Sequence, residues 1–189
     1  MVTHHHHSLL VDWDQAATAA DALASTDEAA QPGPAPTGDA PADDVQAEAT
    51  ERAAHYWDYL RNRPDSITAA LQVIASSRGA TIVHCAAGKD RTGVVAALAL
   101  EVAGVQSADI VADYVASAQR IGPILRRLQA SEFYAADPHT YDVRAQTPTE
   151  ASMQLFLGTL SRHGGARNWL CDHGWTQSEL SALQAKLVG

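Results

Sequence analysis

A cysteine and an arginine six residues apart are the residues of this chain best suited to chemistry. In the stretch IVHCAAGKDRTGVV, Cys85 and Arg91 enclose a short loop between two apolar runs. The backbone of such a loop can curl so that its N–H groups point inward at a tetrahedral dianion. The spacing therefore predicts a phosphate-binding loop made of Ala86, Ala87, Gly88, Lys89, Asp90 and Arg91.

Cys85 would lie at the centre of that loop. The inward N–H dipoles, the Arg91 guanidinium and the Lys89 ammonium all favour a thiolate over a thiol, so we predict a nucleophile near neutral pH. The planar guanidinium of Arg91 can hold two phosphoryl oxygens while their charge redistributes during transfer. The Thr92 hydroxyl can donate to the sulfur when it leaves, although a threonine here can also serve as a plain helix cap.

The elements around the loop predict an α/β fold. The β-branched run 80–84 indicates a strand before the loop, and the apolar run 94–105 indicates a buried helix after it. Strand, tight loop and helix in this order are typical of the carboxyl edge of an α/β sheet, where ligands bind.

Helical spacing predicts most of the remaining structure. One helix should run from about residue 48 to Pro64, and a second should start at Asp65 or Ser66 and stop at Gly79. The C-terminal half reads as mostly helical, with helix starts at two expected capping boxes, Thr147 with Glu150 and Thr176 with Glu179.

The charge of the chain is uneven. The net charge of -9 belongs to the front, because residues 1–51 contain ten of the 22 acids and none of the 13 bases. Residues 25–50 also hold four of the eight prolines, so we predict a disordered acidic segment there. Residues 1–24 then form an N-terminal strand and acid-loop remnant, and residues 51–189 form the catalytic domain.

Composition also bears on the compartment. The chain has two cysteines, no apolar run of about 20 residues and no signal-peptide pattern. We expect a cytoplasmic protein without a membrane span, with leaderless export left open. The HHHH run at residues 4–7 reads equally as a tag remnant or part of a native edge strand. No ligand spacing supports a metal site from His84, Cys85 and His173.

The stretch HCAAGKDRTG resembles the H-C-x5-R-[ST]-G motif of the cysteine-dependent protein tyrosine phosphatases. With Gly88-Lys89-Asp90 it is most similar to the bacterial tyrosine and phosphoinositide phosphatases, and weaker similarity extends over residues 45–189. The resemblance implies a central sheet flanked by helices and no cofactor. It also implies Cys85 as the nucleophile, Arg91 with Lys89 as phosphate ligands, and Thr92 as the leaving-group helper.

The resemblance offers two candidates for the general acid that protonates the leaving group. Asp90 lies in the loop itself, and Asp12, in LLVDWD, falls where relatives have an aspartate after a strand. We favour Asp12 slightly and keep Asp90. Asp14 is a near neighbour of Asp12, and an exposed carboxylate without a role is the other interpretation of Asp12.

The expected substrates are phosphorylated proteins, above all phosphotyrosine, with phosphoserine, phosphothreonine and phosphoinositides also considered because Lys89 adds charge. We expect no nucleic-acid partner. Relative to the family, the chain would be N-terminally shortened, and an incomplete sheet with an exposed edge would favour oligomers. The alternative function is a catalytically impaired module that binds phosphate.

Overall fold

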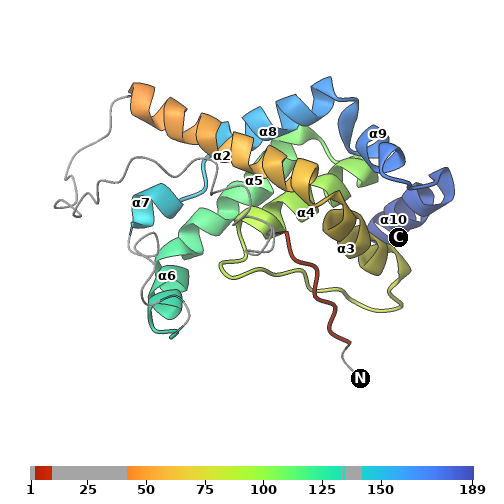
Figure 1. Cartoon of the computed structure of the whole chain (residues 1–189), viewed down its shortest axis with the longest axis horizontal. Helices are drawn as coiled ribbons and strands as arrows, with labels where there is room; N and C mark the ends of the chain where they lie inside the picture. Colours follow the sequence, from red (N-terminus) through yellow and green to blue (C-terminus); the bar gives the residue numbers. More distant parts are fainter. Residues whose placement is uncertain (1–2, 10–41, 133, 135–141) are drawn as a thin grey trace, which may run out of the picture.

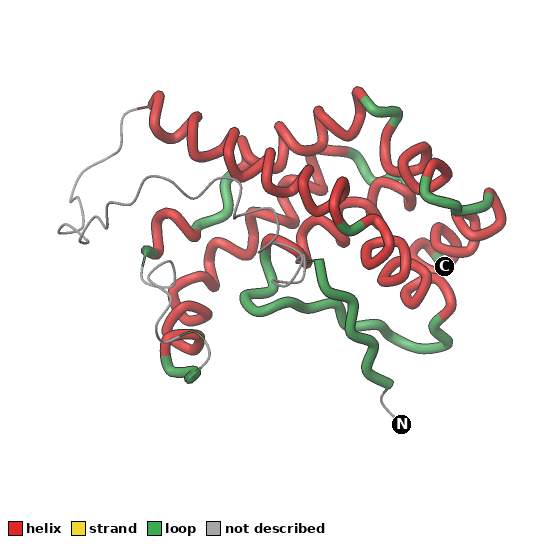
Figure 2. Tube along the Cα trace, viewed as in Figure 1, coloured by secondary structure: helices red, strands yellow, loops and turns green. Residues whose placement is uncertain are grey.

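The structure is a computed structural model that describes residues 3–9, 42–132, 134 and 142–189. The elements in this part of the chain are helices joined by loops (Figures 1 and 2). They are α2 (Ala42–Asn62), α3 (Pro64–Ser76), α4 (Asp90–Ala103), α5 (Ser107–Ala116), the 3-10 turn η1 (Ser117–Arg120), α6 (Ile121–Gln129), α7 (Val143–Gln146), α8 (Glu150–Arg162), α9 (Gly165–Asp172) and α10 (Gln177–Val188).

Helix α4 lies at the centre of the helical core. It contacts α2, α3, α5, α9 and α10, while α2 runs alongside α8 (Figure 1). A helix that is apolar nearly all round must have its faces covered by other elements to be kept from water. The neighbouring helices cover α4 in this way. Its buried side chains are Val94, Val95, Ala97, Leu98, Ala99 and Val102.

The predicted strand at residues 80–84 is wrong, because these residues form a loop in the structure (Figure 2). Ile82 is 87% exposed, and no backbone hydrogen bond joins this segment to another described segment. A β-branched run favours a strand only where a neighbouring strand completes the hydrogen bonds and packs against its side chains. Residues 3–9 contain no strand either, so the expected sheet is not found among the described residues.

Helix α2 begins earlier than its apolar spacing indicated. Residues 42–50, which were assigned to the disordered acidic segment, belong to the helix, so the prediction is wrong for them. The stretch after Pro41 is rich in alanine and glutamate, which are good helix formers, and Ala49 is 2% exposed in the packed structure. Residues 25–41 lie outside the described residues.

The N-caps of α3 and α8 differ from the predicted ones. Pro64 occupies the first position of α3, so Arg63 rather than Asp65 or Ser66 is the N-cap. For α8 the cap is Thr149, whose side chain accepts from the Ser152 N–H, rather than the predicted Thr147.

The structure corrects one predicted helix end and confirms one predicted capping box. Helix α3 ends at Ser76 rather than at Gly79. The predicted capping box of Thr176 and Glu179 at the start of α10 is confirmed.

Gly93, in the first turn of α4, allows Tyr114 of α5 to pack closely. A Cβ atom at Gly93 would lie 2.9 Å from Cδ2 and 3.2 Å from Cε2 of the Tyr114 ring. This ring is 5% exposed and its hydroxyl is hydrogen-bonded, so it has little room to move. We expect Gly93→Ala to lower the free energy of unfolding by about 1–3 kcal/mol, measured by urea denaturation.

Gly79→Ala is the matched control. A Cβ atom at Gly79 meets nothing within 4 Å, and the residue has no positive φ angle. The control should therefore lose no stability. If the two variants were equally stable, a methyl group at Gly93 would not disturb the packing of the Tyr114 ring.

Candidate active site

Residues 85–91, which we call the nucleophile loop, run from Cys85 into the first turn of α4. Gly88 turns the loop with a φ angle of 72°, a left-handed conformation that glycine adopts without steric strain. The turn brings the Gly88 backbone N–H to 3.3 Å from Sγ of Cys85. The loop therefore curls back on the sulfur, as the spacing of Cys85 and Arg91 predicted.

The surroundings of Cys85 favour its thiolate. Partial burial by itself raises the pKa of the thiol, because it disfavours the charged form. The Thr92 side chain, the backbone N–H groups of Thr92 and Gly88, and the charge of Arg91 act in the opposite direction and outweigh it. As a result, the pKa of Cys85 lies below its ordinary value.

Thr92 has a hydroxyl that is available to the sulfur. Its Oγ1 atom is buried and, among the described residues, has no hydrogen-bond partner of normal geometry. A buried unpaired hydroxyl is costly and is often found at functional sites. Beside Cys85 it is positioned to donate to a sulfur anion.

Lys89, which is buried, and Asp90, which is partly exposed, form an ion pair at the start of α4. The Lys89 side chain is 3% exposed, and its Nζ lies 2.7 Å from Oδ2 of Asp90. Burial lowers the pKa of Lys89, and the Asp90 carboxylate offsets part of this effect. The other oxygen of Asp90, Oδ1, accepts a hydrogen bond from the Tyr56 hydroxyl at 2.5 Å. Both carboxylate oxygens of Asp90 are therefore engaged.

Of the two cations in the nucleophile loop, Arg91 is the one left available to an anion. Its side chain is partly exposed, and it has no ion-pair partner within the part of the chain that the structure describes. The neighbouring carboxylate of Asp90 pairs with Lys89 instead. Arg91 also acts on Cys85, because its positive charge contributes to the lowered pKa of the thiol. A guanidinium near a cysteine sulfur that also receives the backbone N–H groups of Gly88 and Thr92 is suited to a phosphoryl dianion.

Comparison with known proteins agrees with this geometry. The model of the family described as "Tyrosine phosphatase family" matches residues 2–189. The chain belongs to the tyrosine phosphatase family. The resemblance carried by HCAAGKDRTG is thereby confirmed.

Two curated relatives of the phosphatase family illustrate the match. The chain is 30% identical over 122 residues to a tyrosine-protein phosphatase of Nostoc commune, covering 61% of this chain and 42% of that protein. It is 47% identical over 123 residues to the triple specificity protein phosphatase PtpB of Mycobacterium tuberculosis, covering 57% of this chain and 44% of that protein. The chain thus spans less than half the length of either relative.

The structure brings together most of the residues that the family resemblance singled out. Cys85 and the predicted phosphate-binding residues 86–91 form a loop and the first turn of α4, and the Thr92 side chain interacts with the sulfur. Asp12, the favoured general acid, and its neighbour Asp14 lie outside the described residues. The geometry around Asp90 therefore bears on the choice of acid, and that around Asp12 does not.

The motif did not predict three residues that lie near the nucleophile loop. Tyr56 and Arg52 come from α2 and Tyr114 comes from α5, far from the motif in sequence. The Tyr114 hydroxyl lies 2.6 Å from that of Tyr56, and the Arg52 guanidinium interacts with both tyrosines and with Asp90. The available signal was the spacing of four between Arg52 and Tyr56, which places two polar tips on one face of a helix.

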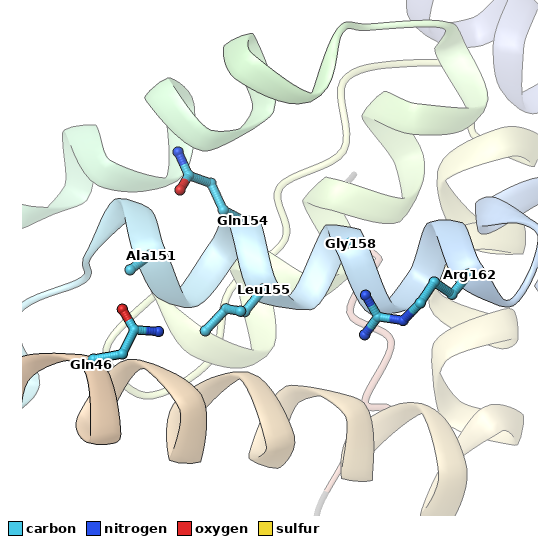
Figure 3. Close-up of a pocket in the computed structure, with 6 residues that line it drawn as sticks. All are labelled: Gln46, Ala151, Gln154, Leu155, Gly158 and Arg162. Carbon is cyan, nitrogen blue, oxygen red and sulfur yellow. The ribbon is translucent and has the colours of Figure 1, made fainter. Parts of the chain in front are cut away.

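The hollow shown in Figure 3 is separate from the nucleophile loop. It lies between α2 and α8 and contains none of the loop residues. Its lining residues are Gln46, Ala151, Gln154, Leu155, Gly158 and Arg162.

The described residues contain no candidate metal centre and no candidate membrane span. In the residues with described positions, histidine, cysteine and carboxylate side chains do not gather in groups of three or more that would hold a metal ion. His84 stacks on His4 with ring centroids 6.2 Å apart. None of the described helices combines the length and the apolar character that a membrane crossing needs.

Proposed function

We propose that the chain hydrolyses phosphate monoesters, above all phosphotyrosine, through a phosphocysteine formed on Cys85. The observation that carries the proposal is the lowered pKa of Cys85 inside a loop that points the Gly88 N–H at the sulfur. The partly exposed guanidinium of Arg91 supplies the second requirement, a cation for the phosphoryl oxygens. Family membership and the activities in the relatives' names support the same reaction.

The proposed reaction has two steps. In the first, the Cys85 thiolate attacks phosphorus, the S–P bond forms as the ester P–O bond breaks, and a general acid protonates the leaving oxygen. In the second, water attacks phosphorus and gives a proton to the conjugate base of the general acid, the S–P bond breaks, and phosphate leaves. The Thr92 hydroxyl would stabilise the thiolate that returns, and Arg91 would hold the non-bridging oxygens in both steps.

We propose that Asp12 rather than Asp90 is the general acid. A general acid must carry a proton and reach the leaving oxygen. Asp90 accepts from the Tyr56 hydroxyl through one oxygen and pairs with the Lys89 ammonium through the other, which are the interactions of an ionised carboxylate. Asp90 is therefore an anchor of the loop, which leaves the role of acid to Asp12.

The burial of Lys89 bears on the substrate. Its ammonium is 3% exposed and paired with Asp90, so it presents little charge to the additional phosphates of a phosphoinositide headgroup. This favours phosphotyrosine as the main substrate. Phosphoserine and phosphothreonine remain within the proposal, because one of the relatives is a triple specificity phosphatase.

Hydrolysis of para-nitrophenyl phosphate tests the proposal. The folded chain should release phosphate, and orthovanadate, which resembles the transition state, should inhibit the release. A folded chain that binds orthovanadate but releases no phosphate would overturn the proposed hydrolysis and identify a phosphate-binding module.

A further inference from the structure

A chain of buried hydroxyl groups connects α5 and α2 to the nucleophile loop. Tyr56 is 0% exposed, and its hydroxyl lies 2.6 Å from that of Tyr114 while donating to Oδ1 of Asp90. A phenol has one hydrogen, and Tyr56 uses it on the carboxylate. Tyr114 must therefore donate to Tyr56, so the chain runs in one direction, from Tyr114 to Tyr56 to Asp90.

Asp90 connects this chain of hydroxyl groups to the loop. Its second oxygen is paired with Lys89, whose own carbonyl oxygen accepts from the Gly93 N–H at 2.6 Å. The residue immediately before Lys89 is Gly88, whose N–H points at the Cys85 sulfur. Fixing the Asp90 carboxylate therefore fixes the corner of the loop that closes on the nucleophile.

We infer that Tyr56 is a positioning residue that acts through Asp90 to hold the nucleophile loop closed on Cys85. The consequence for turnover rests on the proposed function, but the closed loop itself is measurable without turnover. Arg52 supports the same arrangement from α2, because its charge interacts with Tyr56, Tyr114 and Asp90.

The hydroxyl of Tyr56 can be removed without removing its ring. The ring contacts those of Tyr114 and Phe156 edge to face, with centroids 6.2 Å and 6.0 Å apart. Tyr56→Phe keeps these contacts but leaves one oxygen of the Asp90 carboxylate without its donor. A partly buried carboxylate in that state shifts toward water or toward Lys89, and the loop corner moves with it.

The experiment follows the rate at which iodoacetamide alkylates Cys85 as a function of pH. Only the thiolate reacts, so the midpoint of the profile reports the apparent pKa of the thiol. Arg91, Lys89 and Tyr59 are the charged or titratable side chains that interact with Cys85, and they are the same in every variant used. We expect Tyr56→Phe to raise the midpoint above that of the wild-type chain, because the Gly88 N–H no longer faces the sulfur.

Tyr114→Phe is the matched control. It removes a hydroxyl from the same buried chain but leaves the contact between Tyr56 and Asp90 in place. Its midpoint should match that of the wild-type chain even where urea denaturation shows a similar loss of stability. An unchanged midpoint in Tyr56→Phe, or an equal shift in both variants, would overturn the inference.

Asp90→Glu keeps the test decisive if Tyr56→Phe does not fold. It keeps the negative charge next to Lys89 but moves the carboxylate away from its place at the Tyr56 hydroxyl, so it should shift the midpoint in the same direction, while no shift would overturn the inference. Where both variants fold, Tyr56→Phe should add little to the shift in an Asp90→Glu background, because both changes act through one contact. Alkylation requires no catalysis, so failure of the proposed hydrolysis would not affect this result.

Discussion

Replacement of Cys85 by serine is expected to reduce phosphate release from para-nitrophenyl phosphate by roughly 10⁴-fold or more, as the loss of a covalent nucleophile does in other enzymes. The loop lowers the pKa of a thiol that is already moderately acidic. The same N–H groups and the same arginine cannot ionise an alcohol at neutral pH. The variant should still fold and bind orthovanadate, because the loop geometry does not depend on the sulfur alone.

Cys171→Ser is the control for this variant. Cys171, at the end of α9, is also partly buried, and its Sγ accepts from the Gln177 side chain at 3.6 Å, away from the loop. Phosphate release by this variant should stay within about twofold of wild type, because a conservative change outside the loop leaves the transition state unaltered. If Cys85→Ser kept most of the activity, Cys85 would not be the nucleophile.

Replacement of Arg91 by lysine is expected to lower kcat by roughly 10²–10³-fold, with a smaller rise in KM. Lysine keeps the positive charge but loses the planar pair of donors that holds two phosphoryl oxygens as their charge shifts. The loss should therefore fall on the transition state more than on binding of the substrate. Steady-state kinetics with para-nitrophenyl phosphate separate the two effects.

Arg162→Lys gives the matching substitution outside the site. Arg162 is exposed at the end of α8 and donates to Thr159 of its own helix. The steady-state kinetics of the variant should therefore equal those of wild type. If Arg91→Lys raised KM and left kcat unchanged, the arginine would contribute to substrate binding alone.

The parts of the structure that the sequence predicted well depend on local interactions. The nucleophile loop is contiguous, and its turn needs only a glycine at Gly88 with a positive φ angle. Helix α4 follows from a run of apolar side chains, and the capping box at Thr176 depends on residues three apart. Such features are determined within one or two turns of the chain.

The features that the sequence did not predict depend on distant partners. A strand at residues 80–84 would require a second strand, and no described segment provides one. The donor to Asp90 is Tyr56, which is 34 residues away in sequence, so no spacing within the motif could indicate it. From the motif alone Asp90 is therefore a candidate acid, whereas the contacts of its carboxylate favour an anchor.

The most direct test is the pH profile of Cys85 alkylation in the wild-type chain, with Cys171 as an internal reference in the same digest. At low pH the sulfur is protonated and unreactive, and the rate should rise through a midpoint below the ordinary thiol value of about 8.5. Inorganic phosphate should slow the reaction at Cys85 and leave that at Cys171 unchanged. A midpoint at or above the ordinary value, with no protection by phosphate, would contradict a nucleophilic thiolate in an anion-binding loop.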